Sequence, residues 1–182
     1  ENQMTANHRL TEEVRRANEG FYRAFESLDI EKMARVWVQD DTAHVIHPGW
    51  TAKYGWEEVR DSWVAIFDNT RYMEFDVTDV HILVVGDLAR VTCVENLRSV
   101  VGDEQNTGQV QATNLYVQRG EQWLMVHHHG SPIVAQSTDL GAGRYELAPI
   151  EFFMPGLWET TVNIEDSVGV KDVVVYKFWI TG

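Results

Sequence analysis

Hydrophobic positions recur along the chain with two different periods. Between Thr11 and about Asn69 the apolar residues return every three to four positions, which is typical of amphipathic helices. From Met73 onward they return at every second position, which is typical of strands with one buried face. Helices followed by strands predict an α+β fold in which helices cover one face of a curved antiparallel sheet.

Three helices are expected in the first part of the chain. Thr11 can cap the first helix, with acidic residues in its first turn, and Asp29 can cap a second, shorter one. A short strand over Thr42–His47 is stopped by Pro48 and Gly49. Gly55 then leads into a third helix, which carries Trp56 and Trp63 towards the core.

The second part predicts a meander of strands. Their expected ranges are Met73–Val84, Leu88–Arg98, Thr107–Gln118 and Gln122–His129, with a turn at Gly86-Asp87, a longer loop at Gly102-Asp103 and a hairpin turn at Arg119-Gly120. With that last turn, the pairs that share a face are Tyr116 with Trp123, Asn114 with Met125 and Ala112 with His127. The opposite stripe, with Leu115, Val117, Leu124, Val126 and His128, is apolar too, so the pairing alone does not show which stripe faces the interior.

Four segments, in this order, resemble the SnoaL-like branch of the nuclear-transport-factor-2-like superfamily. They are the amphipathic opening helix, the stretch His44–Trp50, the helix start Gly55–Val59, and the strand Trp123–Pro132. The last strand is also similar to the association domain of calcium/calmodulin-dependent kinases. The resemblance implies a cystatin-like cone that encloses a pocket, with the Trp123 stripe facing inward, and a homodimer formed through the outer face of the sheet. The superfamily includes isomerases, cyclases, dehydratases and proteins that only bind or oligomerise. The resemblance therefore does not identify a reaction.

Composition narrows the list of partners. Fifteen Lys and Arg against 28 Asp and Glu give a formal net charge of −13, which would repel nucleic acid and an anionic membrane surface. No run of residues approaches the roughly 18 apolar positions of a membrane span. One cysteine, Cys93, excludes an internal disulfide. The expected compartment is the cytoplasm, or the periplasm or exterior if an export signal has been removed.

Candidate pocket residues follow from the expected faces. Those expected to bind a ligand are Trp37, Trp50, Tyr54, Trp63, Asn96, Arg98, Asn114, Tyr116, Trp123 and Met125. Asn96 and Arg98 are expected to share a face with Val94, where one of them could anchor an acidic group. The aromatic residues would form apolar walls.

Proton transfer is assigned to histidines. Imidazole titrates near neutral pH, so His47 or His127 could move a proton if a carboxylate such as Asp40 or Asp41 orients it. The alternative is that these histidines are hydrogen-bonded structural residues. No metal site is expected, because neighbours in His127–His129 point to opposite faces of a strand. Without phosphate loops or a dinucleotide-binding fingerprint, no cofactor is expected either.

The remaining residues predict an addition to the cone. Residues 1–135 form the cone domain, 136–143 a linker, and 144–182 a three-stranded β extension with strands at Arg144–Met154, Leu157–Ile164 and Asp172–Ile180. Gly143-Arg-Tyr145, Phe152–Gly156 and Trp158 resemble FixH- or YtkA-like β domains. Three strands rarely bury enough surface to stand alone, so docking against the cone or against a dimer mate is expected.

Three functions remain open from the sequence. The leading hypothesis is a protein that binds a small apolar or weakly polar molecule in an enclosed, largely apolar pocket. The first alternative is a cofactor-free isomerase, cyclase or dehydratase that uses histidine and carboxylate groups for proton transfer. The second alternative is an oligomerisation module.

Overall fold

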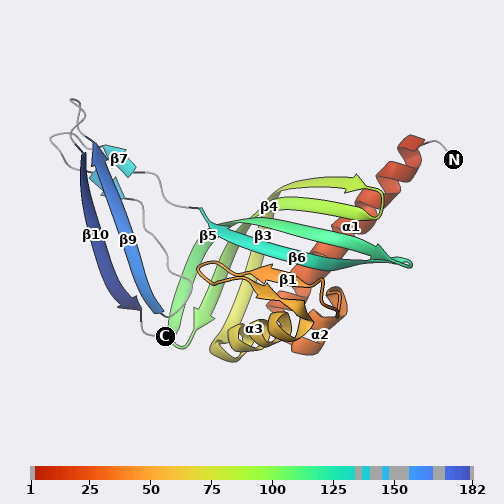
Figure 1. The fold of residues 1–182 in the computed structure, drawn as a ribbon, viewed down its shortest axis with the longest axis horizontal. Helices are drawn as coiled ribbons and strands as arrows, with labels where there is room; N and C mark the ends of the chain where they lie inside the picture. Colours follow the sequence, from red (N-terminus) through yellow and green to blue (C-terminus); the bar gives the residue numbers. More distant parts are fainter. Residues whose placement is uncertain (1–2, 134–136, 140–144, 148–155, 166–170, 181–182) are drawn as a thin grey trace. The chain divides into compact units, whose positions relative to one another are not determined.

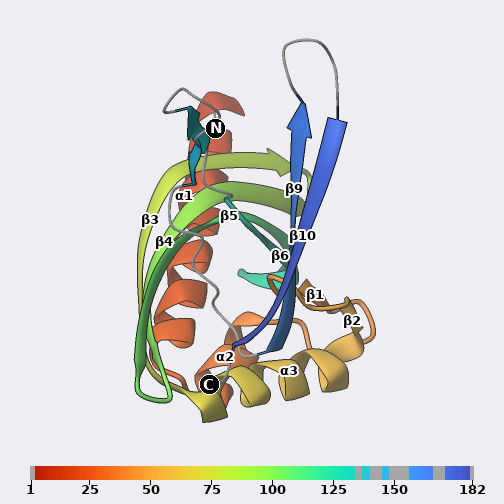
Figure 2. The ribbon, with the colours of Figure 1, turned by 90° about the vertical axis from the view of Figure 1, so that its left-hand side faces the viewer.

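The computed structural model describes residues 3–133, 137–139, 145–147, 156–165 and 171–180, with side chains described for residues 7–133. Residues Glu1–Glu151 form one compact unit and Phe152–Gly182 a second. The helices are α1 (Gln3–Glu26), α2 (Ile30–Val36) and α3 (Gly55–Asn69). In the first unit, helices lie against a strongly curved sheet, and α1 runs along its inner side (Figures 1 and 2). No described helix is long and apolar enough to cross a membrane.

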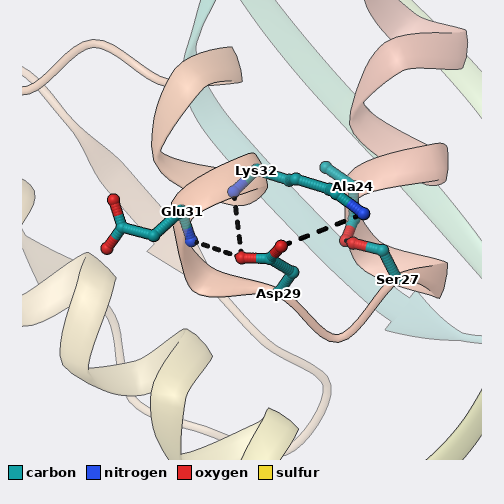
Figure 3. A network of polar contacts seen from close by, with 5 residues as sticks. All are labelled: Ala24, Ser27, Asp29, Glu31 and Lys32. Carbon is teal, nitrogen blue, oxygen red and sulfur yellow. Dashed lines mark hydrogen bonds and ion pairs between the residues drawn. The ribbon is translucent and has the colours of Figure 1, made fainter.

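The cap predicted at Asp29 is confirmed, whereas the one predicted at Thr11 is wrong. The Asp29 carboxylate accepts hydrogen bonds from the backbone N–H groups of Glu31 and Lys32, at 2.9 and 3.3 Å (Figure 3). Helix α1 begins at Gln3, and the Thr11 hydroxyl donates to the carbonyl of Asn7, four residues earlier. Residues 3–10 contain neither Gly nor Pro, so nothing stops the helix from extending past Thr11.

Six strands form the sheet of the first unit: β1 (His44–Ile46), β2 (Lys53–Tyr54), β3 (Thr70–Val85), β4 (Leu88–Val101), β5 (Glu104–Arg119) and β6 (Gln122–Pro132). Their order is β2-β1-β6-β5-β4-β3. The α+β cone predicted from the sequence is confirmed. The sheet is mixed rather than purely antiparallel, because β1 lies parallel to β6. Gly102 and Asp103 make a tight turn instead of the longer loop expected, since Val101 pairs directly with Glu104.

The register predicted for the last hairpin is wrong, and the error has two parts. The turn lies at Gly120-Glu121, so Arg119 pairs with Gln122 and Tyr116 with Met125. A β-bulge then follows, because Leu115 pairs with His127 and leaves Val126 as an extra residue. A one-residue shift sends every later side chain to the opposite face. His128 is therefore buried inside, while His127 and His129 lie on the outer face of the sheet.

An aromatic core fills the space between helices and sheet. Phe21 and Phe25 of α1 pack edge-on against Trp63 of α3, with ring centroids 5.8 and 4.8 Å apart. Asp29 fixes where α2 starts, and α2 contributes the fully buried Met33. These contacts hold α1 and α3 over the inner face of the sheet, where the polar groups of the next section lie.

The described residues after Ile133 contain four further strands. They are β7 (Ser137–Asp139), β8 (Tyr145–Leu147), β9 (Gly156–Glu165) and β10 (Lys171–Ile180). β7, which lies in the stretch predicted to be a linker, pairs with β8, and β9 forms an antiparallel hairpin with β10. The last two predicted strands thus have counterparts in β9 and β10. Of the predicted strand Arg144–Met154, Tyr145–Leu147 is strand, and its other residues lie outside the described residues.

Candidate functional site

A network of buried polar side chains crosses the interior between α1 and the sheet. Its members come from α1, β4, β5 and β6: Asn18, Tyr22, Glu95, Asn114, Tyr116 and His128. Polar groups this deeply buried cost free energy unless they are hydrogen-bonded, so each is expected to have a partner. The hydrogen bonds observed join all six into one continuous chain.

Glu95 lies at one end of this network. The Tyr22 hydroxyl donates to Glu95 Oε1 at 2.7 Å and lies 3.2 Å from the Cys93 sulfur. Asn114 Nδ2 donates to the Tyr22 oxygen at 3.3 Å and to Asn18 Oδ1 at 2.8 Å. Tyr116 donates to the same Asn18 oxygen at 2.9 Å. Asn18 and Tyr22, one helical turn apart on α1, therefore tie that helix to β4 and β5.

His128 lies at the other end. Its Nδ1 is 2.6 Å from Asn114 Oδ1, and because that oxygen can only accept, Nδ1 carries the proton. The ring packs against Phe21, with centroids 5.1 Å apart. A continuous hydrogen-bonded path thus joins a carboxyl group and an imidazole through Tyr22 and Asn114.

Burial sets the protonation of both ends. It raises the pKa of the Glu95 carboxyl to about 7, although the hydrogen bond from Tyr22 lowers it in part. It also lowers the pKa of His128 well below its usual value, with help from the neighbouring histidines. Near neutral pH the network therefore contains a carboxyl group that can hold or release a proton and an imidazole that is neutral.

The sequence-predicted pair of His47 and Asp41 does not form. His47 is buried, and its Nε2 donates to the Ser62 hydroxyl at 2.9 Å, while that hydroxyl donates to the carbonyl of Val59 at 2.6 Å. Burial lowers the pKa of His47 to about 3. Asp41 is exposed on the surface. Ser62 rather than a carboxylate therefore orients this ring, as expected if His47 is a hydrogen-bonded structural residue.

The predicted ligand-binding residues divide between the two faces of the sheet. The interior contains Trp37, Trp63, Asn114, Tyr116, Trp123 and Met125, all buried. Trp50 is half-buried beside His47, with ring centroids 5.3 Å apart.

Three predicted residues lie away from that interior. Asn96 and Arg98 point outward on β4, where Asn96 donates to the carbonyl of Asp76 and Arg98 pairs with Glu74 at 3.5 Å. The side chains of β4 that face the interior here are instead those of Cys93, Glu95 and Leu97. Tyr54 is 66% exposed, because β2 lies at the sheet edge.

Two indole N–H groups in the interior have no hydrogen-bond partner. Trp37 Nε1 and Trp63 Nε1 are both buried and unpaired, and their rings lie 6.3 Å apart. Trp63 also contacts His47 edge-on, at 4.6 Å, and lies 6.0 Å from His128. The two rings that carry the orphaned donors are thus neighbours, and Trp63 also lies near the histidine end of the network.

The sequence reasoning missed Glu95, His128, Asn18 and Tyr22. A signal existed for Glu95, which is the acidic member of the otherwise apolar alternation Val91, Cys93, Glu95, Leu97. Asn18 and Tyr22 occupy the helix face that also carries Val14, Phe21 and Phe25. A polar residue inside an apolar stripe is the pattern that would have identified them.

Comparison with known proteins places this geometry in a family. The family model of the SnoaL-like domain matches residues 14–135. The chain belongs to the SnoaL-like domain family. F-box protein SKIP8 from Arabidopsis thaliana is 31% identical over 114 residues, which are 63% of this chain and 47% of that protein. This SnoaL-like chain thus spans less than half the length of that relative.

Solved structures share the same cone. A candidate dehydratase of the NTF2-like family from Streptomyces avermitilis is 36% identical, with a TM-score of 0.65, over 69% of this chain and 96% of that one. A candidate calcium/calmodulin-dependent protein kinase type II association domain from Thiobacillus denitrificans is 31% identical, with a TM-score of 0.56, over 64% and 92%. A candidate scytalone dehydratase from Novosphingobium aromaticivorans, 16% identical with a TM-score of 0.65 over 79% and 100%, shows the fold alone.

Glu95→Gln tests the buried carboxyl. The folded protein keeps the Glu95 proton up to about pH 7, whereas an ordinary glutamate releases it near 4.5, so wild-type stability falls as pH rises between these values. Tyr22 and Cys93, which face Glu95, stay protonated throughout, because burial raises their pKa values as well. Above pH 7 Glu95→Gln should be more stable than the wild type by up to about 3 kcal/mol, with little difference at pH 4.5.

Urea unfolding at pH 4.5, 6 and 8 measures this difference, with Glu121→Gln at the exposed hairpin turn as the control. An equal effect of Glu95→Gln at all three pH values would contradict a neutral, buried carboxyl group.

Proposed function

We propose that this SnoaL-like protein binds a small, largely apolar molecule inside its curved sheet, and that the molecule presents a neutral hydrogen-bond acceptor to Trp37 and Trp63. The observation that carries the proposal is the pair of orphaned indole N–H groups. Leaving a buried donor unpaired costs about 1–3 kcal/mol, and a ligand oxygen would remove that cost. Interiors with apolar walls and a few polar groups are typical of small-molecule sites.

The charges of the interior favour a neutral ligand. Among the buried residues that the structure describes there is no Lys or Arg, and the one buried carboxyl group has a raised pKa. A carboxylate or phosphate ligand would therefore enter without a compensating cation, which is costly in an apolar environment. A ketone, a lactone or a similar carbonyl compound fits the two donors and the aromatic rings around them.

Matched pairs of cyclic ketones and the corresponding hydrocarbons test this binding proposal. Ketones should bind more tightly than their hydrocarbon partners, and Trp37→Phe or Trp63→Phe should weaken ketone binding about tenfold, the equivalent of one hydrogen bond. Hydrocarbon binding should change little, because phenylalanine keeps the apolar wall. Titration calorimetry gives the affinities, and Trp56→Phe is the control.

Equal affinity for ketones and hydrocarbons in the wild type would contradict the role of the two indoles. So would tryptophan variants that lose both ligand types together, since that result indicates damaged packing.

A cofactor-free isomerase, cyclase or dehydratase is the second candidate function. The observation that favours it is the hydrogen-bonded path from Glu95 to His128, because a carboxyl group with a pKa of about 7 can give and take protons at neutral pH. The 36% identity with a candidate dehydratase agrees with this chemistry. Glu95 replaces the sequence-predicted His127 in the role, since His127 lies on the outer face.

Exchange of ketone α-protons for deuterium, followed by NMR, tests proton transfer before a natural substrate is identified. A ketone that binds should exchange faster with the wild type than in buffer, and Glu95→Gln should slow this about 100-fold while binding is retained. His127→Ala should leave the rate unchanged. Bound ketones that show no exchange, or exchange that survives Glu95→Gln, would exclude this role but leave the binding proposal intact.

A homodimer through the outer face of the sheet is proposed as the assembly. Half-buried apolar side chains lie on this face, at Val94, Leu115, Leu124 and Val126. An apolar sheet face of this kind is stabilised when a second protein surface packs against it. The 31% identity with a candidate kinase association domain fits an oligomerisation role as a further alternative.

Light scattering tests this assembly. Wild-type protein should have twice the chain mass, and Leu115→Glu should yield monomers, because a charge would be buried at the contact. Ala65→Glu, on the exposed side of α3, should leave the mass unchanged. Wild-type protein of single-chain mass at micromolar concentration would refute the dimer.

A further inference from the structure

Three histidines lie together on the outer face of the sheet, on the opposite side from the Glu95 network. In the register of the parallel strands, His44 of β1 is beside His127 of β6, and Ile46 is beside His129. His44 and His127 are thus direct neighbours across two strands, and His129 is the next residue on the same face of β6. The bulge at Val126 brings His127 and His129 to this face.

Two ring nitrogens of this cluster are buried and have no partner. They are His44 Nε2 and His127 Nδ1. Among the described side chains, only the indole N–H groups of Trp37 and Trp63 are also buried without a hydrogen-bond partner. Tyr54 stacks on His44, with ring centroids 4.6 Å apart and planes at 9°, and so keeps that imidazole in place. A nitrogen that is held in place, buried and unpaired is available to a ligand.

The spacing of the rings suits one ion between them. A metal bound at about 2.0–2.1 Å from a ring nitrogen lies about 3.2 Å from the ring centre. The centroids of His44 and His127 are 4.6 Å apart, with their ring planes at 33°, a separation that one ion bound to both rings can span once the rings turn towards it. The centroids of His127 and His129 are 6.3 Å apart, close to the largest span that one ion allows, which corresponds to ligands on opposite sides.

We propose that His44 and His127 bind a divalent copper or nickel ion on the outer face of the sheet, with water or a reoriented His129 in the remaining positions. Imidazole nitrogens suit copper and nickel, and copper binds most tightly of the first-row divalent ions. No set of three His, Cys, Asp or Glu side chains among the described residues is arranged to hold a metal without such a rearrangement. The proposal is independent of any ligand in the interior.

Copper titration of the intact chain, freed of metal by a chelator, tests the site. Calorimetry should detect one Cu²⁺ per chain, and the electron paramagnetic resonance spectrum should show hyperfine splitting from at least two imidazole nitrogens. His44→Ala and His127→Ala should each weaken binding at least tenfold, and His129→Ala less. His81→Ala, which removes an exposed histidine of β3, is the control and should bind as the wild type does.

If an alanine variant unfolds, the electron paramagnetic resonance spectrum of the wild type still tests the proposal. His44→Asn and His127→Asn then serve as milder substitutions, with melting temperatures measured without metal to confirm folding. Splitting from fewer than two nitrogens in the wild type would overturn the proposal. Folded variants of both residues that bind copper as tightly as the wild type would also overturn it.

Discussion

The extra residue at Val126 in β6 is the local constraint on which both faces of the sheet depend. Without this bulge, the alternation that buries Trp123 and Met125 would also turn His127 inward. With it, His128 reaches Asn114 in the interior, and His127 joins His44 outside. One residue that has no direct opposite on β5 thus decides which imidazole belongs to the aromatic core and which two lie on the outer face of the sheet.

Periodicity was enough to predict most of the architecture. Three correct predictions rest on local preferences: the change from helical to alternating spacing near residue 70, the cap at Asp29 and the Gly86-Asp87 turn. Such preferences depend on neighbouring residues, so a short stretch of sequence is enough to show them. The start of α1 was missed because Thr11 is a good cap but nothing before it interrupts a helix. The parallel placement of β1 beside β6 depends on residues about 80 positions apart, which no short pattern contains.

The candidate site was harder to predict than the fold, for a related reason. Trp37 and Trp63 were correctly placed inside from helix phase, whereas Asn114 and Tyr116 were placed there from strand pairing together with the family resemblance. The phase of β4 could not be fixed from its own residues, so Glu95 was overlooked while Asn96 and Arg98 were favoured. In β6, the one-residue displacement of the turn moved the pairing partners by two residues and preserved the faces, but the bulge at Val126 reversed them. Errors of even size are harmless in a sheet, whereas errors of odd size exchange its interior for its exterior.

The edges of the six-stranded sheet carry a separate consequence, for solubility. An unpaired strand edge can recruit another chain and grow into fibres. One edge here is β2, which has only two residues, Lys53 and Tyr54. The other is β3, whose ladder is interrupted between Thr78 and His81, where Asp79 has a φ of 49°. A short edge with a lysine and a kinked edge with an aspartate both make poor templates, so the sheet resists edge-to-edge polymerisation without a closed barrel.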